Sequence, residues 1–306
     1  HCHASPQTGV AICSQIAQCL RFSANPRPPP FPSARKFVTN ANTFPLVKRP
    51  DLGYNSYIDM RTKNHEGGLP MTLRKDTLET KRRILSVCVR LFLQQGYHAT
   101  SISQIAAEAG ISVSTFQNIF RTKDAVLHEL IGFMFSGQFS AARDMAGPSL
   151  PPVYAYAVET AIQLTLTELN ENLREIYIEA YSLPDTSEYI YLHTTAELKQ
   201  IFGANFPDYS DSDFYEMEIG TAGLMRSYMV RKCDIHFPLE RKLSRFLTAS
   251  MRVYRVSEEE QAKVLALIQS LDIKAIATEV MYKLFAVLEM KYDFKLSKGS
   301  ETEERK

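Results

Sequence analysis

The chain has 306 residues, and its 35 lysines and arginines almost balance its 34 aspartates and glutamates, which gives a formal net charge of +1. Hydrophobic residues make up 45% of the chain, which is typical of globular proteins, and the length is that of about two domains. No run approaches the roughly 18 apolar residues that a membrane span requires, so we expect a soluble protein with no membrane partner.

Residues 1–73 are predicted to be a disordered extension. They carry loop-forming runs, NPRPPPFP at 25–32 and HEGGLP at 65–70, and no helical or strand period. The first fifty residues lack Asp and Glu, as transit peptides do, but they show no amphipathic arrangement. A simpler interpretation is that the functional chain begins near Met60 or Met71. The polar residues 296–306 are expected to be a disordered tail.

Apolar residues recur at helical spacing from Thr77 almost to the end, which predicts an all-α fold. The first helix, Thr80 to Gln95, places apolar residues on one face and ends at Gly96. We expect one domain over residues 74–125 and a larger helical domain over 126–295. The later helices are expected at Lys123 to Met145, Val153 to Tyr181, Thr186 to Phe202, Asp213 to Lys232, Leu239 to Tyr254, Glu258 to Ser270 and Ile273 to Lys291.

Two short helical patterns around Gly110 carry the strongest functional signal. Ser101 with Gln104 predicts a capping box at the start of the first, and Ala106 is small enough for close helix approach. Gly110 supplies the left-handed backbone that ends this helix, and Ser112 caps the next one. The spacing predicts a helix-turn-helix.

The second of these helices has a polar outer face. Its apolar residues Val113, Phe116, Ile119 and Phe120 recur at helical spacing. The short side chains that donate and accept hydrogen bonds are therefore left on the outward face of the helix. Such side chains read base edges in the major groove of DNA, whereas a merely solvated face would carry more Lys and Glu. An ordinary αα-hairpin in a helical bundle is the alternative. The outward residues are Ser114, Thr115, Gln117, Asn118 and Arg121.

Residues 80–130 resemble the N-terminal DNA-binding domain of the TetR/AcrR family of bacterial transcriptional regulators. The resemblance is carried by TKRRIL, LFLQQGYHATSISQIAAEAGISVSTF and IFRTKDAVL. It implies a three-helix DNA-binding head, a larger helical domain that binds a small-molecule effector, and a homodimer. It also implies a phosphate contact at Thr122 and Lys123, at the start of the next helix. Gln117 and Asn118 stand where the family usually has Tyr and His.

Basic residues at the start of the first helix lie beside the candidate DNA surface, where neutralising phosphates favours binding. They are Arg74, Lys75, Lys81, Arg82 and Arg83. The expected DNA-binding residues are Ser101, Ser112, Val113, Ser114, Thr115, Gln117, Asn118, Thr122, Lys123 and Arg82.

The larger domain is rich in aromatic residues and methionine. Such residues more often form core, but tyrosine hydroxyls and methionine also suit an apolar cavity with a few polar groups. The expected effector-binding residues are Tyr177, Tyr181, His193, Met217 and Met225. In the family, helices near the C-terminus pair in the dimer, and a face with small residues on the helix from Asp213 suits such pairing, with Leu239 to Tyr254 or the final helix as its partner. A face buried within one domain would look the same in the sequence. This face comprises Ile219, Ala222, Gly223, Arg226 and Met229.

The five cysteines are scattered without a C-x-x-C pair, so a reducing cytoplasm is the expected location, and no metal or other cofactor is expected. No catalytic constellation is visible, because the histidines stand alone. The sequence therefore predicts a homodimeric repressor, not an enzyme, that binds double-stranded DNA at a pseudo-palindromic operator and is released by a small-molecule effector. Two alternatives stay open: a helical protein-interaction module with a degenerate DNA-binding head, and an enzyme in the C-terminal domain.

Overall fold

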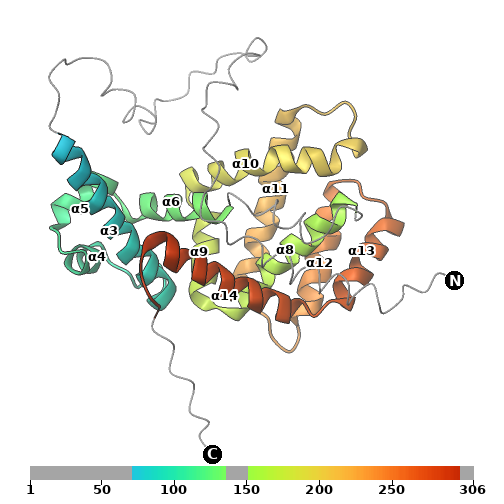
Figure 1. The fold of residues 1–306 in the computed structure, drawn as a ribbon. Helices are drawn as coiled ribbons and strands as arrows, with labels where there is room; N and C mark the ends of the chain where they lie inside the picture. The colour runs from blue at the N-terminus through green and yellow to red at the C-terminus, as the bar shows by residue number, and fades with distance from the viewer. Residues whose placement is uncertain (1–70, 136–150, 297–306) are drawn as a thin grey trace, which may run out of the picture. The chain divides into compact units, whose positions relative to one another are not determined.

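The computed structural model describes residues 71–135 and 151–296 (Figure 1). Within these ranges all regular elements are helices, which confirms the all-α prediction. Described residues from Thr80 onward belong to one compact unit and those before it to another, and every contact given below lies within the first. The predicted extension of residues 1–73 lies almost wholly outside the described residues. The end of the helix predicted from Lys123 to Met145 and nearly all of the predicted tail lie outside them as well.

Three helices form the N-terminal part, which we call the head. They are α3 (Met71–Gln95), α4 (Ile102–Glu108) and α5 (Val113–Phe120). The apolar face expected on the first helix is buried, and the aromatic rings of Phe116 and Phe120 pack at 6.0 Å from each other under α5. α3 begins at Met71 rather than at Thr80, because the residues between them are neither Pro nor Gly and continue the helix.

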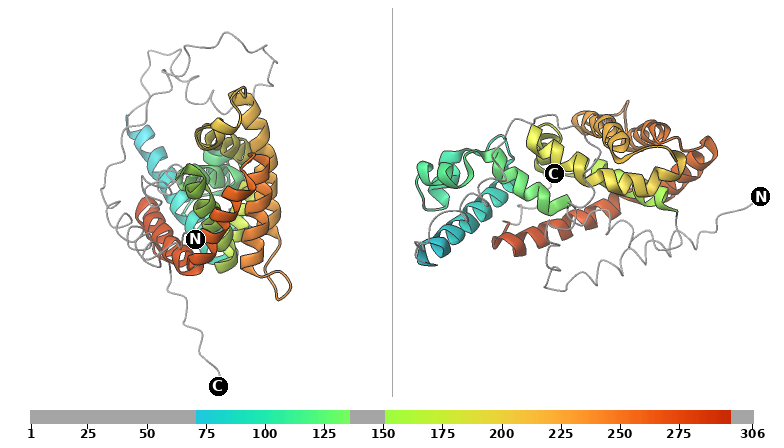
Figure 2. Two further views of the ribbon diagram at one scale, coloured as in Figure 1. Left: turned by 90° about the vertical axis from the view of Figure 1, so that its right-hand side faces the viewer. Right: turned by 90° about the horizontal axis from the view of Figure 1, so that it is seen from above.

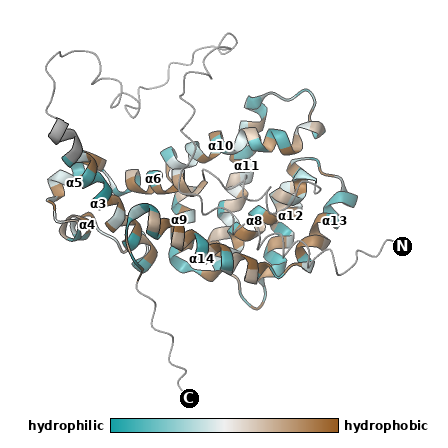
Figure 3. Ribbon diagram, in the orientation of Figure 1, coloured by the Kyte–Doolittle hydropathy of each residue, from teal (hydrophilic) through white to brown (hydrophobic). Residues whose placement is uncertain are grey.

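A larger bundle follows the head, and α8 lies in its middle (Figures 1 and 2). Nearly every residue of α8 is buried, and α8 contacts α9, α10, α11, α12, α13 and α14. Hydrophobic and hydrophilic residues alternate around the ribbons of the bundle, as expected of amphipathic helices (Figure 3). The elements are α6 (Lys123–Phe135), α8 (Pro152–Leu169), α9 (Glu171–Ala180), α10 (Pro184–Phe202), η2 (Gly203–Asn205), α11 (Asp211–Val230), α12 (Leu239–Val253), α13 (Glu258–Ser270) and α14 (Ile273–Tyr292).

The prediction of a single helix from Val153 to Tyr181 was wrong, because the chain breaks at Asn170. Asn170 has extended backbone angles, φ −144° and ψ 119°, and its side chain accepts a hydrogen bond from the backbone N–H of Leu173 at 2.9 Å. One residue thus ends α8 and caps α9. The break has no proline or glycine to mark it, which is why the periodic pattern concealed it.

The predicted capping box at the start of α4 forms only in part. Ser101 Oγ accepts from the backbone N–H of Gln104 at 3.1 Å, but the Gln104 side chain bonds to Gln95 and Glu108 instead. A reciprocal box is present elsewhere: Ser210 and Asp213 begin α11 with both bonds in place. Among the described helices, none has the length and apolar content needed to cross a membrane.

Candidate DNA-binding surface and effector cavity

The turn between α4 and α5 has the geometry that the sequence predicts. Gly110 has a φ of +64°, and the backbone N–H groups of Gly110 and Ile111 close the end of α4 on the carbonyls of Ala107 and Ala106 at 3.2 and 3.0 Å. Ser112 Oγ then accepts from the N–H of Thr115 at 3.1 Å and starts α5. The helix-turn-helix prediction is confirmed in this geometry.

The two left-handed glycines of the head predict a difference in stability. A Cβ on Gly110 would meet nothing within 4 Å, whereas one on Gly96, at φ +93°, would lie 2.6 Å from Glu175 Oε2. Gly110→Ala should therefore cost only the backbone strain, about 1–2 kcal/mol. Gly96→Ala should cost more, because the Glu175 carboxylate has to move and its hydrogen bond with the backbone N–H of His98 is disturbed. Urea unfolding of both variants measures this, and equal costs would contradict the close approach of α9.

The outer face of α5 presents polar side chains on an apolar base. Phe116 and Phe120 are buried, while the residues between them on the other side of the helix are exposed. Thr115 differs from the other predicted residues, because it is half-buried and its hydroxyl lies 2.9 Å from that of Ser112. The predicted DNA-binding residues that are exposed on or beside this face are Ser112, Val113, Ser114, Gln117 and Asn118.

The remaining predicted DNA-binding residues lie around this face. Ser101 is exposed at the start of α4, and Arg82 is exposed on α3. Thr122 is exposed and its hydroxyl accepts from the N–H of Ala125 at 3.3 Å, which caps α6. Lys81, in contrast, forms an ion pair with Glu129 within the protein.

Lys123 does not face outward as a phosphate contact would. Its ammonium donates to the backbone carbonyls of Tyr97 and Thr100 at 2.6 and 2.9 Å, and lies 4.0 Å from the centre of the Tyr97 ring. Burial lowers the pKa of Lys123. The neighbouring Asp124 accepts a hydrogen bond from the Tyr97 hydroxyl. Both residues fasten the start of α6 to the turn between α3 and α4.

The change Lys123→Met tests this role. It keeps the apolar stem but removes the donor to both carbonyls, of which that of Tyr97 keeps the backbone N–H of Thr100 at 3.2 Å, so we expect the free energy of unfolding to fall by about 1–3 kcal/mol. The matched control, Lys263→Met at an exposed position of α13, removes only a surface ion pair with Glu259 and should leave stability nearly unchanged. Denaturant unfolding gives both values. If stability held and the salt dependence of DNA binding fell by about one charge instead, Lys123 would be a phosphate contact after all.

α9 also binds this turn of the head. Asn172 Nδ2 donates to the carbonyl of Leu93 at 2.8 Å, Glu175 accepts from the backbone N–H of His98 at 3.1 Å, and Glu179 lies 3.2 Å from the His98 ring nitrogen Nε2. We call Asn172, Glu175 and Glu179 the α9 contact. Sequence reasoning missed it, because polar residues at spacings of three and four look like a solvated helix face.

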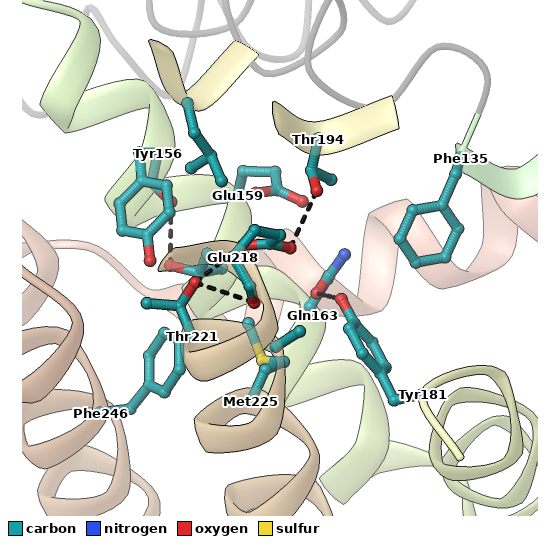
Figure 4. Close-up of a pocket in the computed structure, with 13 residues that line it drawn as sticks. Phe135, Tyr156, Glu159, Gln163, Tyr181, Thr194, Glu218, Thr221, Met225 and Phe246 are labelled. Atoms are coloured by element: carbon teal, nitrogen blue, oxygen red, sulfur yellow. Dashed lines mark hydrogen bonds between the residues drawn. The ribbon is translucent and has the colours of Figure 1, made fainter. Parts of the chain in front are cut away.

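A cavity lies among α6, α8, α10, α11 and α12 (Figure 4). It has an empty volume of about 390 Å³, partly open to solvent. Its enclosed part is small, with room for on the order of one or two water molecules. The residues that line it are Phe135, Tyr156, Glu159, Thr160, Gln163, Tyr181, Thr194, Leu198, Glu218, Thr221, Ala222, Met225 and Phe246.

Two of the five predicted effector-binding residues, Tyr181 and Met225, line this cavity. The other three do not. Tyr177 is buried and packs its ring against Phe135 at 6.3 Å, and His193 is exposed and stacks on a neighbouring tyrosine. Met217 is half-buried against the core.

The centre of the cavity is a buried carboxylate that sequence reasoning missed. Glu218 accepts hydrogen bonds from Thr194 Oγ1 at 2.9 Å and Thr221 Oγ1 at 2.7 Å (Figure 4). Burial raises the pKa of Glu218 to about 7. In the sequence, a single glutamate between apolar residues predicts an exposed position, so only the fold reveals it.

The helix face predicted to pair in a dimer is partly buried and partly exposed. Ala222 and Met229 are buried in the chain's own core, and Arg226 donates to Ser182 Oγ at 2.7 Å. Ile219 and Gly223 are exposed. For Ala222 and Met229 the structure thus matches the other interpretation of this face, burial within one domain, while pairing through Ile219 and Gly223 stays a prediction.

Comparisons with known proteins agree with the geometry of the head. Residues 84–130, which run from α3 into α6, match the family model for bacterial regulatory proteins of the tetR family. This match covers the helix-turn-helix of the head with parts of the helices on either side of it, and the likeness to the tetR family is a likeness of that segment.

Two curated relatives come from Bacillus subtilis (strain 168). Over 116 residues the chain is 29% identical to the uncharacterized HTH-type transcriptional regulator YuxN. The aligned segment makes up 36% of this chain and 38% of that protein. Over 161 residues it is 27% identical to the uncharacterized HTH-type transcriptional regulator YerO. The aligned segment makes up 49% of this chain and 55% of that protein. The chain thus spans about a third to about half of these relatives.

Among solved structures, the chain is similar to a gamma-butyrolactone receptor described as an ArpA-like protein. The two share 16% sequence identity with a TM-score of 0.38, over 66% of this chain and 99% of that one.

Proposed function

We propose that this protein is a DNA-binding transcriptional repressor that acts as a homodimer and is released from DNA by a small-molecule effector. The observation that carries the proposal is the exposed polar face of α5, set on buried Phe116 and Phe120 after a capped turn at Gly110. Residues 74–125 would serve as the DNA-binding domain and residues 126–295 as the effector-binding and dimerisation domain.

The polar side chains of α5 suit direct reading of DNA. Gln117 and Asn118 offer amide groups that can bond to adenine in two places, and Val113 offers an apolar contact for a thymine methyl. In a homodimer the two copies of α5 would enter successive major grooves, roughly 34–36 Å apart. Exposed Arg82 and the start of α6 at Thr122 would contact phosphates.

Two helices support a coupling between the cavity and the head. α6 begins on the head at Lys123 and ends at Phe135, which lines the cavity. α9 carries the α9 contact, and Tyr181 at its end also lines the cavity. The ring of Phe135 packs against that of Tyr181 at 6.3 Å.

An effector that displaced Phe135 or Tyr181 would therefore move the far ends of both helices. Because the enclosed cavity is small, an occupant of larger size has to displace some of its lining. The shift would change the position of the head and lower the population of the DNA-competent state.

A gel-shift titration with DNA from upstream of the protein's own gene tests the proposal. We expect a shift that survives an excess of unrelated competitor DNA, because sequence-specific binding is typically 10³ to 10⁷ times tighter than non-specific binding. A shift that the competitor abolishes at equal concentration would mean that the protein binds by charge alone.

A further inference from the structure

The polar lining of the cavity is acidic. Of the 13 lining residues, Glu159 and Glu218 are glutamates, and none of the 13 is a lysine, arginine or histidine. Both glutamates are only 6% exposed. A buried carboxylate is costly unless a cation or hydrogen bonds compensate its charge.

Glu218 is held by neutral groups. Its two oxygens accept from the hydroxyls of Thr194 and Thr221, and the hydroxyl of Tyr254 lies 2.8 Å from that of Thr221. Burial makes the carboxylate difficult to ionise, and these hydroxyls offset only part of that cost. The site is thus short of positive charge when Glu218 is ionised.

A second glutamate, which is half-buried, shows how the same fold neutralises a carboxylate with its own cations. Glu168, at the end of α8, lies 2.5 Å from the ammonium of fully buried Lys242 and 3.1 Å from the guanidinium of Arg174. Burial acts to raise the pKa of Glu168, but the hydrogen bonds from Lys242 and from the backbone N–H of Cys233, together with the charges of Lys242 and Arg174, outweigh it, so the pKa is lowered. Glu218 differs from Glu168 in having hydroxyls where Glu168 has these cations.

The walls around Glu218 are aromatic and apolar. Four aromatic rings line the cavity: Phe135 from α6, Tyr156 from α8, Tyr181 from the end of α9 and Phe246 from α12. Leu198 and Met225 add aliphatic and thioether surface. Aromatic faces attract cations, and the attraction strengthens when the cation is desolvated.

We propose that the cavity binds an organic cation, a protonated amine with an aromatic or apolar body, whose charged nitrogen lies beside the Glu218 carboxylate. The role of this cation as the effector rests on the proposed function, whereas its binding rests on the cavity alone. The amine supplies the charge that Glu218 lacks, and the body takes the place of Phe135 or Tyr181 against the apolar wall.

Three small probes of similar shape and different charge test the inference by calorimetric titration of the full chain. They are benzylamine, the uncharged ethylbenzene and the anionic phenylacetate. We expect benzylamine to bind at least about tenfold more tightly than ethylbenzene, and phenylacetate to bind most weakly. Equal or tighter binding of ethylbenzene, or no binding of benzylamine, would overturn the proposal.

The variant Glu218→Gln keeps the shape and removes the charge. It should weaken benzylamine binding about tenfold or more and leave ethylbenzene within about twofold. The matched control Glu216→Gln, on the exposed face of the same helix, should change neither. An unchanged benzylamine affinity in Glu218→Gln would contradict the proposal. If that variant failed to fold, the affinities of the three probes for the wild type would still test whether the cavity prefers a cation.

The pH dependence gives an independent readout. The titratable groups facing Glu218 are Glu159 and Tyr156 on α8, Tyr181 after α9 and Tyr254 after α12, and the pKa values of all three tyrosines are raised by burial. Below a pH of about 7 a proton competes with the amine for Glu218, so benzylamine affinity should rise by up to about tenfold per pH unit toward neutrality. Glu218→Gln should show no such rise.

Failure of this inference and failure of the proposed function give different results. Tight ethylbenzene binding without benzylamine binding would overturn the cationic ligand and leave the proposed regulator intact. Benzylamine binding through Glu218 with unchanged affinity for DNA would confirm the cationic site and contradict release by this ligand.

Discussion

Replacing Gln117 and Asn118 together by alanine should lower the affinity for the operator, the specific DNA site, by about 2–6 kcal/mol. Each amide that contacts a base is worth about 1–3 kcal/mol of discrimination. Both residues are exposed and lie outside the core, so the free energy of unfolding should stay nearly constant. Competition binding against a mutated operator separates this loss of discrimination from a uniform loss of affinity.

The matched control is Gln269→Ala, an exposed glutamine on α13 far along the chain from the head. It should affect neither DNA binding nor stability. If the double variant bound specific and unrelated DNA as the wild type does, α5 would not be the reading helix. If neither the wild type nor the double variant distinguished the operator from unrelated DNA, the alternative of an interaction module with a degenerate DNA-binding head would be favoured instead.

The change Phe116→Ala should destabilise the protein by about 3–5 kcal/mol, because Phe116 is fully buried beneath α5 and its loss leaves a cavity. DNA binding should fall with it, since α5 loses the base that orients its polar face. Thermal and urea unfolding measure the stability, and circular dichroism reports whether helix content is kept.

Val113→Ala on the same helix separates the two effects of the Phe116 variant. Val113 is 39% exposed, so its truncation should cost less than about 0.5 kcal/mol of stability. A change in DNA affinity without a change in stability would place Val113 in contact with DNA. A stability loss as large as that of Phe116→Ala would mean that α5 faces the core differently.

The parts of the head that the sequence predicts well are those governed by local chemistry. Gly110 needs a left-handed backbone, and Ser112 satisfies the free N–H groups at the start of α5. These requirements act within a few residues, so their signals are visible in the sequence. The polar face of α5 follows from the same helical spacing.

The parts that the sequence does not reveal depend on contacts between distant segments. Lys123 looks like a surface cation until its carbonyl partners, more than twenty residues earlier, are brought beside it. Glu218 looks exposed until α8 and α10 close over it, and only Tyr181 and Met225 of the predicted effector-binding residues line the resulting cavity. Asn170, which turns α9 toward the head, is a third case, because asparagine marks a helix break less clearly than proline.

The α9 contact and the start of α6 meet at the same turn of the head, between α3 and α4. From α9, Asn172 donates to the carbonyl of Leu93 and Glu175 accepts from the N–H of His98. From α6, Lys123 donates to the carbonyls of Tyr97 and Thr100. The position of the head therefore depends on two helices that both end at the cavity. This arrangement supports the ligand-controlled repressor that we propose.

Selection of binding sites from a random DNA library by the full chain tests the central claim most directly. We predict enrichment of a two-fold symmetric sequence whose half-sites are centred about one helical turn, or a multiple of it, apart. The Gln117 and Asn118 double variant should enrich a different sequence or none. If the wild-type chain enriched no sequence, the claim that α5 reads DNA would be contradicted.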